Sequence, residues 1–424
     1  MKPAATLATQ LAETARIVAR VAAGRSLAEE MEHLPPTAIG SRAALIDLAH
    51  GTLRRFGRVQ AIVSSLSKRS RPDALVEALL WSALYALESG RYSEHTVVDE
   101  AVKACGLVEL WPAKGYVNAL LREFLRQRGA LEAQLANQPE ATYRHPGWWI
   151  ESLQRVYPVE WQAVLAAGNA HPPMALRVNR RRADPDMYQA RLGAENIAAH
   201  RLGAEGLVLE RPLPVERVPG FAAGEVSVQD IGAQRAAHCL DLRPGQRVLD
   251  ACAAPGGKAA HILELADVDL TALDVDAARA ARIAPTLQRL GLHARIQQND
   301  AAQPEEWWDG RPFDRILADV PCSASGIVRR RPDVKWLRRA SDIPQFAQQQ
   351  GALLSALWRV LAPGGKLLYA TCSIFPEEND AVVATFVEAE SNARQLPPPD
   401  GARAQWLPDA EHDGFYYALI EKRA

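Results

Sequence analysis

The sequence predicts a chain of three parts: an all-α front half, a small α+β connector and a C-terminal α/β domain built on a doubly wound parallel sheet. Three observations predict this division. Apolar residues recur at helical spacing up to about residue 130, and prolines interrupt short apolar stretches from about 140 to 220. From Gly245 onward, strand-like runs alternate with helical ones. We expect domains at 1–135, 136–235 and 236–424.

The front half is expected to be a helical bundle. Its clearest helix covers 73–88, where leucines and alanines recur every three or four positions. Similar stripes, separated by Gly, Pro and Ser, cover about 5–22, 41–56 and 113–127. No cluster of catalytic residue types is found in this half.

The C-terminal part reads as alternating strands and helices. The predicted strands are 246–252, 269–275, 294–299, 313–319 and 365–372, and the predicted helices are 257–266, 277–290 and 343–361. A late run, 415–421, would add an edge strand. Because ligands of such sheets lie beyond the carboxyl ends of the strands, functional residues are expected there.

Composition excludes several classes of protein. The formal charge is -1, no run of about 18 apolar residues occurs, and the N-terminus lacks a compact apolar segment with a cleavage signature. We therefore expect a cytoplasmic protein without a membrane partner. Five scattered cysteines without a C-x-x-C pair argue against a disulfide framework and a zinc ribbon, and no metal site is predicted.

A glycine turn after the first strand predicts the cofactor site. The segment 250–258 reads D-A-C-A-A-P-G-G-K and leads into a helix whose first N–H groups lack partners. Lys258 is followed by Ala259, which excludes a P-loop, and the adjacent glycines do not match the dinucleotide pattern. Asp250 and Asp300 add negative charge, which suits a cationic sulfonium. S-adenosylmethionine fits best, with Asp274 at the end of the second strand expected to hold the ribose.

Two cysteines stand at the ends of neighbouring strands. Cys322 follows the fourth strand and Cys372 closes the fifth, so both sulfurs should face the crevice. A single free cysteine usually packs as a small apolar residue. That interpretation holds for Cys105 and Cys239, and we prefer it for Cys252. A pair at crevice positions favours a catalytic role, although the spacing does not say which sulfur does what.

Several motifs together resemble a known family. V-L-D-A-C-A-A-P-G-G-K (248–258), D-V-P-C-S-A-S-G (319–326) and A-T-C-S (370–373) resemble the RNA cytosine-C5 methyltransferases. The front half, with G-Y-V-N-A-L-L-R (115–122), resembles a NusB-type domain. Over nearly the whole chain, the sequence is similar to the RsmB/Sun-type methyltransferases of bacterial 16S ribosomal RNA. One departure is Arg331, where this family usually has His.

The resemblance implies a NusB-like bundle, a connector and a Rossmann-like class I methyltransferase domain that methylates carbon 5 of a specific cytosine. It makes Cys372 the nucleophile, Cys322 the residue that assists proton removal, and Asp319 a contact of both base and cofactor. The implied cofactor residues are Cys252, Ala253, Ala254, Pro255, Gly256, Gly257, Lys258, Asp274, Asp300 and Asp319. DNA cytosine methyltransferases lack the second cysteine, so DNA is not expected.

The expected partner is 16S ribosomal RNA, as a stem-loop in an unassembled or partly assembled subunit, bound by a monomer. Between 329 and 339 there are six basic residues and one acid, and this run is expected to flank the crevice and contact phosphates. Trp336 would either stack on a base or pin the loop to the core. Three alternatives remain open: a tRNA substrate, a non-catalytic RNA-binding or antitermination factor, and a dinucleotide-dependent oxidoreductase.

Overall fold

The structure is a computed structural model that describes residues 6–34, 42–67, 72–398 and 401–424. The chain forms two compact units. The first comprises Met1–Ala170 together with Val328–Ala340, and the second comprises His171–Ile327 together with Ser341–Ala424. Among the described helices, none combines the length and apolar character that crossing a membrane requires.

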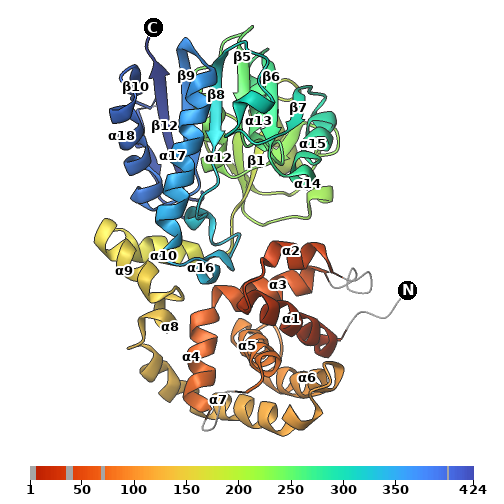
Figure 1. Cartoon of the computed structure of the whole chain (residues 1–424). Coiled ribbons are helices and arrows are strands. Elements are labelled where there is room, and N and C mark those ends of the chain that lie inside the picture. Colours follow the sequence, from red (N-terminus) through yellow and green to blue (C-terminus); the bar gives the residue numbers. More distant parts are fainter. Residues whose placement is uncertain (1–5, 35–41, 68–71, 399–400) are drawn as a thin grey trace. The chain divides into compact units, whose positions relative to one another are not determined.

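The described residues of the first unit fold into helices alone (Figure 1). These are α1 (Leu7–Ala22), α2 (Leu27–Glu32), α3 (Arg42–Arg54), α4 (Phe56–Leu66), α5 (Ala74–Ser89), α6 (Glu94–Leu107), α7 (Lys114–Leu135), α8 (Pro139–Tyr143), α9 (Gly147–Val156), α10 (Trp161–Asn169) and α16 (Val334–Leu337), apart from one short 3-10 turn. Of the four predicted helical stripes, 5–22 corresponds to α1, 41–56 to α3 and the start of α4, 73–88 to α5, and 113–127 to α7. Positions 5 and 41 lie outside the described residues.

Helix α5 lies at the centre of this bundle. It packs against α1, α3, α4, α6 and α7, so its side chains are buried on nearly every face. This burial is expected of a helix that carries apolar residues on all sides. The helix begins where Asp73 accepts a hydrogen bond from the Leu75 amide at 2.8 Å, and it ends at Gly90, whose φ of 68° is left-handed.

Part of the basic run is buried, because 328–340 belongs to the helical unit and packs within it. Lys335 is fully buried, and its Nζ donates to Asn169 Oδ1 at 2.7 Å and to the Arg54 carbonyl at 3.2 Å. Burial holds the pKa of Lys335 well below its usual range. The Arg329 carbonyl in turn accepts a hydrogen bond from Arg54 at 2.9 Å. Part of the run therefore serves internal packing rather than phosphate contact.

Trp336 pins this segment to the bundle. Its indole N–H donates to the Leu53 carbonyl at 2.8 Å, and its ring meets Phe56 edge-on at 5.3 Å. We expect Trp336→Ala to destabilise the helical unit by about 2 kcal/mol through the lost packing and hydrogen bond. Hydrogen exchange of α3 and α4 amides should then accelerate. Arg331→Ala, at an exposed position of the same segment, is the control, and equal exchange in both variants would contradict the anchoring role.

The second unit contains two sheets. The smaller one, in the order β2-β3-β1-β4, is antiparallel and carries one helix. Its elements are β1 (Met174–Val178), α11 (Pro185–Ala194), β2 (Ala199–Arg201), β3 (Gly206–Leu209) and β4 (Val226–Val228). One face packs on α11, and the other, through Ala175 and Val208, packs on Ile231 at the start of the next helix. The predicted α+β connector corresponds to this sheet and α11, whereas the first part of the predicted range forms α8, α9 and α10 of the first unit.

The larger sheet has the order β10-β12-β9-β8-β5-β6-β7, with β11 paired to β12 (Figure 1). Its strands are β5 (Arg247–Asp250), β6 (Asp269–Asp274), β7 (Arg295–Gln298), β8 (Phe313–Asp319), β9 (Leu361–Thr371), β10 (Ala393–Leu396), β11 (Gln405–Trp406) and β12 (Phe415–Lys422). Neighbouring strands from β7 to β9 are parallel, and β12 is antiparallel to β9. The sequence prediction of 415–421 as an edge strand is wrong, because β12 lies between β9 and β10.

Helices cover both faces of this sheet. They are α12 (Ile231–Cys239), α13 (Gly257–Leu265), α14 (Ala277–Ala280), α15 (Ile283–Leu290), α17 (Asp342–Val360) and α18 (Asp380–Ala389). Successive strand residues alternate between two cores: Leu249 packs on the side of α17 and α18, and Val248 on the side of α12, α13 and α15.

The single helix predicted over 277–290 is wrong in one respect, since it is broken between α14 and α15. Pro285 has no N–H to donate to the carbonyl one turn earlier, at position 281, so the helix restarts with Pro285 in its first turn.

Candidate active site

The two cysteines lie next to each other at the carboxyl ends of β8 and β9. These strands pair in parallel with Asp319 opposite Ala370, so the loops that follow them start at the same edge of the sheet. Cys322 Sγ and Cys372 Sγ are 3.4 Å apart. Cys322 is 9% exposed, whereas Cys372 is half-buried and thus the more accessible sulfur.

A buried hydrogen-bond network holds the two cysteine loops together. Glu378 accepts from the Ser323 amide at 2.7 Å through one carboxylate oxygen and from the Ser373 hydroxyl at 2.6 Å through the other. The Ser325 hydroxyl accepts from the Ile374 amide at 2.8 Å. All these polar groups are excluded from water, so each loop is fixed by partners in the other. Sequence reasoning missed Glu378, whose only signal was an acid shortly after the second cysteine motif.

Gly326 provides a direct backbone link between the loops. Its amide donates to the Cys372 carbonyl at 2.8 Å, and its own carbonyl accepts from the Gly414 amide at 2.9 Å. A Cβ at position 326 would lie 2.3 Å from the Gly414 carbonyl oxygen, so only glycine allows this approach.

The environment of Cys322 favours its protonated thiol. The hydrogen bond with Cys372 and burial both raise the pKa of Cys322 well above its usual value, and the charge of Glu378 acts in the same direction. Because its pKa is raised, the Cys322 sulfur, once ionised, binds a proton more tightly than a free thiolate does.

Lys258 brings a fixed positive charge to the same place. Its ammonium forms an ion pair with Asp319 at 2.5 Å, between side chains that are 14% and 28% exposed. Burial alone would lower the pKa of Lys258, but the attraction of Asp319, followed by that of Cys372, raises it. The ammonium is thus held charged beside both the carboxylate and the more accessible sulfur.

The glycine turn joins β5 to α13 next to these groups. Gly256 has a φ of 100°, which favours glycine, and its amide donates to the Ala253 carbonyl at 2.7 Å. Ala254 donates through its amide to Asp274 Oδ2 at 3.2 Å, so the turn is tied to the end of β6. Cys252 is half-buried within this turn, where burial and the neighbouring carboxylates raise its pKa.

Asp274 ends β6 and Asp300 follows the end of the neighbouring β7, but each already has protein partners. Asp274 is 2% exposed, accepts from the Asp276 amide at 3.1 Å and forms an ion pair with Arg279 at 3.1 Å. Asp300 is half-buried and accepts from the Ala302 amide at 2.9 Å. The side chains around the turn are rich in carboxylates, which fit a cofactor that carries a positive sulfonium and ribose hydroxyls.

Asp250 is the most deeply buried acid of this group. Burial, followed by the charge of Asp319, raises the pKa of Asp250 to about 7 against the opposing charge of Lys258. An acid whose pKa is higher in the folded than in the unfolded chain stabilises the fold below about pH 4, and this contribution is lost as the pH rises through about 7.

We therefore expect Asp250→Asn to gain stability relative to the wild type as the pH rises from about 5 to 8, by a few kcal/mol. Urea unfolding of both proteins across this range measures the difference. Asp267→Asn, at an exposed position, should show no such trend. A difference between Asp250→Asn and the wild type that stays constant with pH would contradict the raised pKa.

Comparisons with known proteins agree with this architecture. Residues 237–421 match the family model of the 16S rRNA methyltransferase RsmB/F, residues 145–216 match the ferredoxin-like domain of RsmF/B-like methyltransferases, and residues 13–126 match the NusB family. The predicted fold class, with a NusB-like bundle, a connector and a methyltransferase domain, is therefore confirmed.

The chain is similar over most of its length to named relatives. It is 43% identical over 396 residues to ribosomal RNA small subunit methyltransferase B of Pseudomonas syringae pv. tomato, covering 89% of this chain and 88% of that protein. Identity to the protein of the same name from Escherichia coli O7:K1 is 40% over 390 residues, covering 90% and 91%.

Solved structures show the same fold. PH0851 matches with a TM-score of 0.79 at 24% identity, over 97% of this chain and 99% of that one. A methyltransferase homologue protein from Pyrococcus horikoshii matches with a TM-score of 0.56 at 27% identity, over 65% of this chain and 99% of that one. With these matches added to the geometry of the glycine turn and the paired cysteines, the chain belongs to the RsmB/F family of 16S rRNA methyltransferases.

Proposed function

We propose that this chain transfers a methyl group from S-adenosylmethionine to carbon 5 of a cytosine in 16S ribosomal RNA, by family resemblance cytosine 967, through a transient covalent bond between Cys372 and carbon 6. The observation that carries the proposal is the 3.4 Å separation of the Cys372 and Cys322 sulfurs at the carboxyl edge of the sheet. S-adenosylmethionine, the cofactor of this family, supplies an electrophilic methyl group. The glycine turn, Asp274, Asp300 and Asp319 would hold it.

Cys372 is the better nucleophile of the two sulfurs. It is more accessible than Cys322, and the Lys258 ammonium attracts its negative charge. A thiolate is the reactive form of cysteine. Addition of the Cys372 thiolate to carbon 6 breaks the aromaticity of the ring and makes carbon 5 nucleophilic.

Asp319 supports the charge that develops on the base. The Lys258 ion pair fixes its carboxylate, which would contact the cofactor. The same carboxylate would accept a hydrogen bond from N3 of the base once thiolate addition has made N3 basic enough to take a proton from solvent. Once carbon 5 carries the methyl group, its proton must leave and the bond between Cys372 and carbon 6 must break. Cys322, which contacts Cys372, would accept the carbon 5 proton after losing its own thiol proton to solvent. The electron pair of the broken C–H bond then forms the double bond between carbons 5 and 6 as the bond to Cys372 breaks, which returns the ring to aromaticity and Cys372 to a thiolate.

The substrate is proposed to be a stem-loop in an unassembled or partly assembled subunit, bound by one copy of the chain. A cytosine must leave its stack to reach both sulfurs, and this costs least in single-stranded loops. Methylation of tRNA uses the same chemistry. A non-catalytic RNA-binding role is disfavoured, because it would not need two sulfurs and a fixed ammonium at the same edge of the sheet.

Bisulfite sequencing tests this proposal directly. Purified protein is incubated with S-adenosylmethionine and either a 16S rRNA transcript or bulk tRNA. We expect one protected cytosine in the 16S transcript and none in tRNA. Protection in tRNA alone would refute the substrate, and methylation at a ring atom other than carbon 5 would refute the chemistry.

A further inference from the structure

We propose that Glu205, His238 and His261 form a binding site for a divalent transition-metal ion of the zinc class, separate from the active site. The three residues come from different elements of the second unit. Glu205 directly precedes β3 of the connector sheet, His238 lies in the last turn of α12, and His261 lies on α13. Nothing in the sequence predicted a metal site here, because no short spacing joins the three positions.

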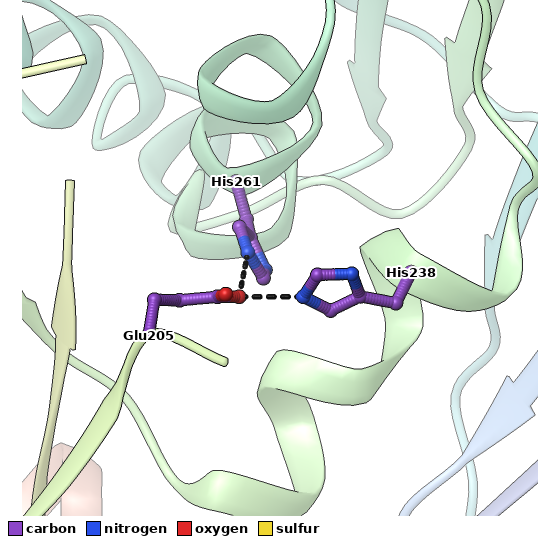
Figure 2. A group of neighbouring side chains, drawn as sticks. All are labelled: Glu205, His238 and His261. Atoms are coloured by element: carbon purple, nitrogen blue, oxygen red, sulfur yellow. Dashed lines mark hydrogen bonds and ion pairs between the residues drawn. The ribbon is translucent and has the colours of Figure 1, made fainter. Parts of the chain in front are cut away.

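The side chains converge on a single point (Figure 2). His238 Nε2 and His261 Nε2 each lie 2.6 Å from Glu205 Oε1, and the three ligand atoms lie within 4.8 Å of one another. Ligands of a tetrahedral zinc ion lie roughly 3.3 Å apart, at about 2.0 Å from the metal. A retreat of the Glu205 carboxylate by about 1 Å would therefore open a place for an ion among the three side chains.

Buried atoms at this point lack hydrogen-bond partners. Glu205 and His261 are each 1% exposed. His261 Nε2 lies close to Glu205 Oε1, but the contact lacks hydrogen-bond geometry. Within the described chain, neither ring nitrogen of His261 has a hydrogen-bond partner, and Glu205 Oε2 has none either. Burying polar atoms without partners is costly. Coordination would satisfy one imidazole nitrogen and both carboxylate oxygens.

The surrounding charge does not oppose a cation. Arg177 faces His261, but Glu264 accepts from its guanidinium at 2.8 and 3.0 Å, so that positive charge is compensated. The His238 side chain is 42% exposed, which gives an ion a route from solvent and leaves room for water as a fourth ligand.

Such an ion would join the connector to the methyltransferase domain. Its ligands would link the connector sheet to α12 and α13, and α13 starts at the glycine turn. None of the three ligands belongs to the active site. Metal binding should therefore raise the stability of the fold, and its effect is separable from the proposed RNA chemistry.

Calorimetric titration of the chelator-treated full chain with Zn²⁺ tests the site. We expect one equivalent to bind, and the melting temperature to rise by about 5 to 10 °C when Zn²⁺ is at 100 times its dissociation constant. His238→Ala should weaken binding at least ten-fold, and because this side chain is partly exposed the variant should fold. His200→Ala is the matched control, since His200 is 50% exposed and pairs with a different acid, Glu411.

Co²⁺ separates this site from the two catalytic sulfurs. Bound by nitrogen and oxygen ligands, it should show visible absorption bands without a thiolate-to-metal band, and the Cys322→Ser/Cys372→Ser variant should still bind one equivalent. Three results would overturn the proposal: no uptake of either ion, equal binding by His238→Ala and the wild type, or loss of the ion with the two cysteines.

Discussion

Cys372→Ala is expected to lose methyl transfer to 16S rRNA by at least about 10⁴-fold, because covalent activation of the ring has no substitute in the pocket. Binding of S-adenosylmethionine should stay near the wild-type affinity, since the glycine turn and the acids at the ends of β6 and β7 do not depend on this sulfur. Transfer of a labelled methyl group measures activity, and calorimetry measures cofactor binding.

Cys105→Ala is the control for this substitution. Cys105 is a buried cysteine of the helical unit, far along the chain from the site, and its loss should leave turnover unchanged in every molecule that folds. Turnover by Cys372→Ala at the wild-type rate would refute the nucleophile assignment. Loss of both turnover and cofactor binding would instead indicate that the pocket had collapsed.

Cys322→Ala should trap the enzyme on its RNA. If Cys322 assists removal of the carbon 5 proton and release of the product, the bond between Cys372 and carbon 6 forms in this variant but breaks slowly. A protein–RNA species that survives a denaturing gel should therefore accumulate when RNA and S-adenosylmethionine are both present, with turnover lowered by roughly 10²-fold or more.

The double variant Cys322→Ala/Cys372→Ala provides the matching comparison and should form no such species. A stable adduct in the double variant would show that another side chain attacks the RNA. If Cys322→Ala alone releases product as fast as the wild type and leaves no adduct, Cys322 has no part in proton removal or release.

Much of this site could be predicted because parallel strands end at one edge of a sheet. Cys322 and Cys372 are far apart in the sequence, yet each follows a strand, and strand pairing brings their sulfurs to 3.4 Å. The glycine turn was recognisable because it, too, directly follows a strand of this sheet. Periodicity also located α5, because apolar residues recur there at the local spacing that is typical of a helix.

Other features depend on contacts between distant segments, which periodicity does not register. Glu378 carries no local signal of its bonds to both cysteine loops. Charge usually faces water, and nothing in the basic run marks Lys335 as buried, yet Lys335 finds its partners in Arg54 and Asn169. The group around Glu205 likewise forms only when the connector sheet meets two helices.

The insertion of 328–340 into the helical unit limits how the protein can be divided. The chain passes from one unit to the other after Ala170, Ile327 and Ala340, so no single cut separates the two. A fragment that starts at 171 would carry Trp336 and Lys335 without the helices that bury them, and a fragment that ends at 170 would lack the segment that caps its own core. Dividing the gene at any one site would therefore leave at least one unit incomplete, because the segments of the two units alternate along the chain.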